Sequence, residues 1–131
     1  MKAIACFLAL MTITMTGPAV AETKTKNIRH SFTIKQGATV PIGSYYLINK
    51  KTCHAGPIPQ IVQTSYPTIG KLIIEQTKVE PTQKQCRGFL IPGYVVRFEA
   101  GNKPGEEKIT YKVLYEKGVG TSLVEDTIAV Q

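Results

Sequence analysis

The sequence predicts an all-β protein, folded as a single antiparallel β-sandwich of about seven strands with one disulfide. Apolar residues alternate with polar ones at a period of two, which is typical of half-buried strands. Glycine and proline interrupt these runs at short spacing, and no stretch of about ten residues keeps a helical period without such a break. Many short strands separated by turns favour a sandwich.

The first 21 residues have the layout of a secretory signal peptide. Lys2 supplies a positive charge, an apolar run follows from Ile4 to Met15, and Gly17-Pro18 breaks it before a small-residue cleavage site ending at Ala21. The apolar run is about half of the ~20 residues that span a bilayer, so we expect no transmembrane segment after cleavage. We therefore expect a periplasmic or secreted protein, without a preference between the two compartments.

The remaining chain has the length of one domain. Residues 22–28 are polar and are expected to form a loose leader, and residues 29–131 form the predicted β-sandwich domain. Its first strand contains Phe32 and Ile34, which alternate with polar neighbours. The apolar run within 71–75 alternates less clearly and is expected to be covered on both faces.

The clearest alternation lies in the C-terminal half. Apolar and aromatic residues recur at every second position in 94–98 and again in 109–115, where Ile109, Tyr111 and Val113 are expected to face the core. A final strand is expected over 123–130, with Ile128 and Val130 on one face.

Two of the three cysteines belong to the predicted domain. Cys6 leaves with the signal peptide, so Cys53 and Cys86 form an even pair in a chain bound for an oxidising compartment. We expect a disulfide between them rather than a free nucleophile or a metal ligand. It would close a loop of about 34 residues, for which the chain-entropy model gives roughly 3–4 kcal/mol.

Residues 67–130 resemble a known family. Pro67-Thr68-Ile69-Gly70, Gly93-Tyr94, the segment from Pro104 to Val113 and the closing strand to Val130 resemble bacterial cadherin-like or Ig-like modules of secreted and surface proteins. The resemblance implies an Ig-like antiparallel β-sandwich. Its motifs are short and mostly turn and core residues, so it implies little about function.

The chain departs from that family pattern in two ways. Where the family commonly carries acidic residues that support calcium, this chain has Glu106 and Glu107 beside lysines and a single aspartate, Asp126, in the predicted domain. Calcium needs several converging oxygen ligands, so we expect no calcium site. The family also usually forms tandem arrays, whereas this chain has one domain, which favours a stand-alone binding role.

A basic cluster flanks the expected disulfide. Because bridged cysteines have Cα atoms roughly 5–6 Å apart, the bridge would bring the cations around them into one region. Two upstream tyrosines could add a stacking surface for a sugar or an aromatic group. The candidate ligand-binding residues are Lys50, Lys51, His54, Lys84, Arg87, Tyr45 and Tyr46. The alternative is a solvated loop around a structural disulfide, with both tyrosines in the core.

Other functional classes lack the residues they need. The only histidines, His30 and His54, belong to no catalytic motif, so we expect no enzyme, no cofactor and no metal site. The net charge of +7 favours anionic partners such as polysaccharide or lipid headgroups, but not nucleic acid, which an exported protein rarely meets. The main hypothesis is a non-catalytic binding module for such a partner.

Two alternatives to that hypothesis stay open. The first is a protein-interaction or inhibitor domain that docks through its loops or a sheet edge. The second is a small periplasmic ligand or metal carrier that uses His30 and His54. The sequence indicates no oligomeric state.

Overall fold

The computed structural model describes residues 24–116 and 118–131, so the predicted signal peptide lies outside the described residues. The described chain contains seven strands and one short 3-10 helix. Their bounds are β1 Thr25–Ile34, β2 Thr39–Tyr45, β3 Gln60–Gln63, β4 Gly70–Val79, η1 Lys84–Cys86, β5 Ile91–Ala100, β6 Gly105–Leu114 and β7 Thr121–Val130.

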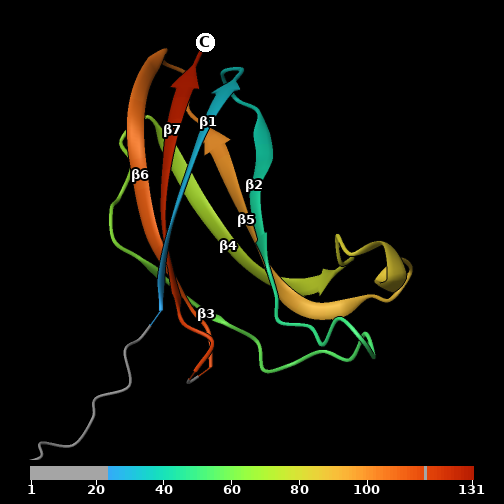
Figure 1. Ribbon diagram of the computed structural model, residues 1–131. Helices are drawn as coiled ribbons and strands as arrows, with labels where there is room; N and C mark the ends of the chain where they lie inside the picture. Colours follow the sequence, from blue (N-terminus) through green and yellow to red (C-terminus); the bar gives the residue numbers. More distant parts are fainter. Residues whose placement is uncertain (1–23, 117) are drawn as a thin grey trace, which may run out of the picture.

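The strands form two sheets that pack face to face (Figure 1), with orders β1-β7-β6-β3 and β2-β5-β4. This confirms the predicted all-β sandwich of seven strands. One pair differs from the antiparallel expectation, because β1 runs parallel to β7. The pairing begins at Thr25, so residues 25–28 of the expected leader belong to a strand. Backbone pairing along β7, together with the packing of Ile28 against the core, orders this mostly polar segment.

The core lies between the two sheets and is filled by alternate residues of the long strands. Ile109 and Val113 on β6 have no exposed surface and Tyr111 only 1 %, which confirms their predicted inward direction. Val96 and Phe98 on β5 pack against them from the other sheet and are also fully buried. Strict alternation of this kind fixes the register of each strand, because a one-residue slip would turn its apolar face to solvent.

Three loops meet at one end of the sandwich. They are the β2–β3 loop (46–59), the β4–β5 loop (80–90) and the β6–β7 loop (115–120) (Figure 1). Strand β1 starts at the same end, where Thr25 is opposite Thr121. The end that carries these loops holds the predicted site residues around the cysteines.

One side of the sandwich is bounded by the edge strands β1 and β2, each of which pairs with a single neighbour. The start of β1 is held close to β7, where the Thr121 amide donates to the Lys24 carbonyl at 2.8 Å. Gly120 makes this approach possible, since it has a φ of +118° and a Cβ at this position would overlap the Lys24 carbonyl oxygen.

Candidate functional site

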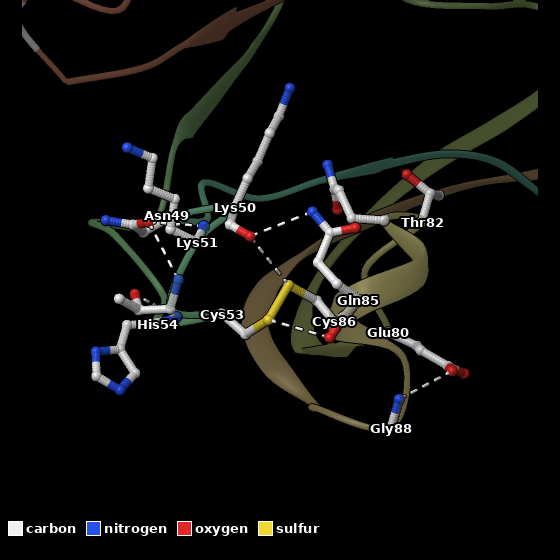
Figure 2. Close-up of a disulfide and its surroundings, with 12 residues drawn as sticks. Asn49, Lys50, Lys51, Cys53, His54, Glu80, Thr82, Gln85, Cys86 and Gly88 are labelled. Atoms are coloured by element: carbon white, nitrogen blue, oxygen red, sulfur yellow. Dashed lines mark hydrogen bonds between the residues drawn. A yellow bond between two sulfur atoms is a disulfide. The ribbon is translucent and has the colours of Figure 1, made fainter.

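A disulfide joins the β2–β3 and β4–β5 loops (Figure 2). Cys53 and Cys86 are bridged with a Cα–Cα distance of 5.4 Å, as predicted from the sequence. Cys86 is completely buried and Cys53 is 9 % exposed, so the bridge lies beneath the surface of the two loops.

The β2–β3 loop is built around Asn49. The Asn49 side-chain oxygen accepts the backbone amides of Lys51 at 2.9 Å and Thr52 at 3.3 Å, which closes an Asx turn. The Cys53 amide donates to the Asn49 carbonyl at 2.8 Å, and the Asn49 amide donates to the carbonyl of His54 at 2.9 Å. Cys53 itself has a φ of +61°, a left-handed conformation that these hydrogen bonds and the disulfide hold in place.

The β4–β5 loop is fixed to its neighbours at two further points. The Gln85 side-chain amide donates to the Lys50 carbonyl at 3.2 Å, directly across from the disulfide (Figure 2). The Tyr46 hydroxyl accepts the Thr82 amide at 2.9 Å and donates to the Gln83 side-chain oxygen at 3.1 Å. We call the two linked loops, residues 46–59 and 80–90, the stapled end.

The five predicted cationic residues all belong to the stapled end and are exposed. Figure 2 shows Lys50, Lys51 and His54 extending away from the sulfur atoms in different directions. Among the ion pairs of the described residues, none includes Lys50, Lys51, His54, Lys84 or Arg87. The staple therefore concentrates positive charge at one end of the domain without directing these three side chains at one point.

The two predicted tyrosines have different surroundings. Tyr45 is buried in the core, where its hydroxyl lies 2.7 Å from the hydroxyl of Tyr111, and burial raises the pKa of Tyr45 to about 12. Tyr46 is half-buried and anchors the β4–β5 loop through its hydroxyl. Tyr46 is therefore the more exposed of the two, and Tyr45 belongs mainly to the core.

Two exposed apolar residues of the stapled end were not singled out from the sequence. Phe89 and Leu90 are 55 % and 62 % exposed and follow the positive-φ turn at Gly88. The Phe89 amide donates to the Cys86 carbonyl at 3.2 Å, which ties this segment to the bridged cysteine. The sequence does not predict this exposure, because two adjacent apolar residues before a strand are as typical of a buried core as of an exposed surface.

A hollow of about 920 Å³ lies beside the stapled end, between the start of β1 and the end of β2. We call it the lateral hollow. Its charged and aromatic lining residues are Lys24, Lys26, Lys50, Glu80, Tyr45, Tyr46 and Tyr115. Lys50, Tyr45 and Tyr46 were predicted site residues, whereas Lys24 and Lys26 fell in the segment that was expected to be a loose leader.

A chain of polar side chains crosses the core beside this hollow. His30 Nδ1 lies 3.1 Å from a carboxylate oxygen of the fully buried Asp126, and the Tyr111 hydroxyl donates to its other oxygen at 3.4 Å. Burial raises the pKa of Asp126, an effect that the hydrogen bond from His30 opposes. A histidine oriented by a carboxylate can act as a general base. Within the described residues, however, no hydroxyl or thiol is hydrogen-bonded to His30.

Metal ligands do not cluster in the described part of the chain. It contains no group of three or more His, Cys, Asp or Glu side chains that could hold a metal ion. His30 lies on β1, whereas His54 lies in the β2–β3 loop. Within residues 24–116 and 118–131, no helix is long and apolar enough to cross a membrane.

Comparison with known proteins gives no family for this chain. No protein family matches its sequence, including the cadherin-like modules that residues 67–130 resemble, and no curated protein matches it. Among solved structures, the chain is similar to PbICP-C in its complex with falcipain-2. The TM-score is 0.34 at 15 % sequence identity, over 88 % of this chain and 95 % of that one. At this TM-score the similarity supports neither a family nor a function.

Proposed function

We propose that this chain is an exported, non-catalytic domain that binds a protein partner through its stapled end. The observation that carries the proposal is the adjacent pair Phe89 and Leu90, which expose 55 % and 62 % of their surface on a loop fixed by the disulfide. Aromatic side chains are enriched among the residues that dominate binding energy in protein interfaces. The side chain of Leu90 offers a polysaccharide neither a hydrogen bond nor an aromatic face on which a sugar ring could stack.

The stapled end is preorganised for binding. The disulfide, the Gln85–Lys50 hydrogen bond and the contacts of Tyr46 hold both loops in place before any partner arrives. Association costs less conformational entropy when the contacting loops are already ordered. The apolar pair can therefore contribute more of its burial energy to affinity.

The charge of the stapled end indicates the partner's surface. Residues 46–59 and 80–90 contain four Lys or Arg and a single carboxylate, Glu80. Arg87 and Lys84 come from the same loop as Phe89 and Leu90. A complementary partner would present an apolar pocket with an acidic rim, since opposite charges at the rim accelerate association and select against other proteins.

The test uses a partner purified by affinity from envelope or extracellular extract and then mixed with the purified domain. We expect a complex of fixed stoichiometry, and we expect Phe89→Ser/Leu90→Ser to weaken it at least about a hundredfold, because two anchors lose their burial. Val62→Ser/Tyr66→Ser is the matched control, since those residues are 44 % and 80 % exposed outside the stapled end. Binding should survive in the control.

Two results would contradict the proposal. One is equal affinity of the wild type and Phe89→Ser/Leu90→Ser for every stoichiometric partner. The other is salt-sensitive retention on acidic polysaccharide with no stoichiometric protein partner, abolished when Lys51, Lys84 and Arg87, which lie outside the lateral hollow, are all changed to Ser. That second result would instead support the anionic-polymer hypothesis.

A further inference from the structure

The lateral hollow is separate from the apolar pair of the stapled end and has its own chemistry. Its volume of about 920 Å³ lies near the upper end of the range of ligand pockets. It opens between the first residues of β1, the end of β2 and the β4–β5 and β6–β7 loops. Four segments that are distant in the sequence therefore contribute to one concave surface.

Three lysines and one carboxylate line this surface. Lys26 is opposite Ser122 in the β1–β7 register, and Ser122 is 6 % exposed, so this register position faces the inside of the sandwich. Lys24 lies two residues earlier, just before β1 begins, and Lys50 comes from the β2–β3 loop. Among the ion pairs of the described residues, none involves these three lysines, and Glu80 supplies the single opposing charge.

The rest of the lining is aromatic and rich in hydroxyl groups. Tyr46 and Tyr115 contribute rings, and the Tyr46 ring is held in place because its hydroxyl binds Thr82 and Gln83. The remaining hydrogen-bonding side chains of the lining are Thr25, Ser44, Thr82, Gln83, Thr121 and Ser122. An aromatic ring beside several hydroxyl and amide groups suits a ligand with one apolar face and many hydroxyls of its own.

We propose that the lateral hollow binds an acidic sugar, a pyranose that carries a carboxylate or phosphate group. The anionic group is held by the ammonium groups of Lys24, Lys26 and Lys50 through charge-assisted hydrogen bonds. The sugar ring packs on Tyr46 or Tyr115, and its hydroxyls exchange hydrogen bonds with the polar lining.

The hollow also continues along the open side of the sandwich. A second hollow of about 470 Å³ shares Lys26, Ile28, Ser44 and Tyr45 with the first and reaches His30 on β1. A groove with this shared lining accommodates more than one sugar ring, so an acidic oligosaccharide is the preferred ligand over a single acidic monosaccharide.

The experiment is calorimetric titration of the purified, disulfide-bonded protein with trigalacturonate, glucose 6-phosphate and the neutral maltotriose. The two acidic probes distinguish a carboxylate from a phosphate ligand. Lys24→Ser/Lys26→Ser removes two of the three cations from the hollow. Lys71→Ser/Lys78→Ser is the control, because it makes the same charge change at two exposed lysines of β4 that do not line the hollow.

We expect an acidic probe to bind, maltotriose to bind much more weakly, and Lys24→Ser/Lys26→Ser to weaken the acidic probe about tenfold or more. The Lys71→Ser/Lys78→Ser control should bind as the wild type does. Amide NMR shifts on titration should centre on residues 44–48 and 120–122. The four substituted residues are exposed lysines, so both variants should fold.

Three results would overturn the proposal: no binding of either acidic probe, equal weakening in both lysine variants, or equal affinity for maltotriose. Equal weakening would mean that only overall charge matters. Phe89→Ser/Leu90→Ser should leave sugar binding intact, so a failed sugar test and a failed partner test can be told apart.

Discussion

Removal of the disulfide tests how much the stapled end depends on a single bond. In Cys53→Ala/Cys86→Ala the covalent link between the β2–β3 and β4–β5 loops is lost, while the Gln85–Lys50 and Tyr46 hydrogen bonds remain. Alanine is preferred to serine because Cys86 has no exposed surface and a serine hydroxyl there would be buried without a built-in partner.

The expected magnitude follows from the length of the closed loop. The cysteines are 33 residues apart, and the chain-entropy model then gives a loss of about 3–4 kcal/mol in the free energy of unfolding. For a domain of this size, each kcal/mol shifts the melting temperature by about 4 °C, so we expect a decrease of roughly 12–16 °C. The lost packing of two buried sulfur atoms adds to this value.

The assay is thermal and urea unfolding of both proteins, each with and without dithiothreitol. The reductant should lower the wild-type midpoint towards that of the variant and leave the variant unchanged. A stability loss below about 1 kcal/mol would refute the reasoning, because the bridge would then restrict little of the unfolded chain. Partner binding should also weaken in the variant, even at temperatures where it is fully folded.

Two further predictions concern the polar chain in the core. In Asp126→Asn, stability should depend less on pH than in the wild type: burial raises the pKa of Asp126 above its unfolded value, so its contribution is present at low pH and is lost as pH rises through the raised pKa. Urea midpoints of both proteins between about pH 3 and 7 measure this difference. Parallel curves of midpoint against pH for the two proteins would contradict it. The titratable groups hydrogen-bonded to this carboxylate are His30 and Tyr111. Tyr45→Phe should cost about 1 kcal/mol, because the Tyr111 hydroxyl loses its 2.7 Å partner but keeps Asp126, and an unchanged urea midpoint would show that the buried contact contributes nothing.

The sequence predicts the parts of the fold that depend on local periodicity. Ile109, Tyr111 and Val113 face the core because alternation in a half-buried strand allows one register only. The same rule could have placed Asp126 in the core, since it shares its strand parity with Ile128 and Val130. In the structure, hydrogen bonds from His30 and Tyr111 compensate for the burial of its carboxylate.

The strand at the start of the domain shows the opposite case. Residues 25–28 are mostly polar, and nothing in their own pattern indicates pairing. They become a strand because β7, whose inner face is fully buried at every second residue, offers a free edge along its whole length. Parallel strands are not joined by a hairpin turn, so no local turn pattern predicts β1. Its strand conformation depends on β7, which lies almost a hundred residues away in the sequence.

The same separation explains why the lateral hollow could not be read from the sequence. Its lysines come from the residues at and just before the start of β1 and from the β2–β3 loop. Each of these residues is ordinary in its own segment: a lysine near a chain end, a lysine in a solvated loop, a tyrosine beside a strand. The parallel β1–β7 pairing brings Lys24 and Lys26 to the open side of the sandwich, opposite Tyr46 and Lys50. The disulfide, which the cysteine pair predicts, fixes the β2–β3 loop beside the hollow. What has no local sequence pattern is the parallel pairing that places the start of β1 there.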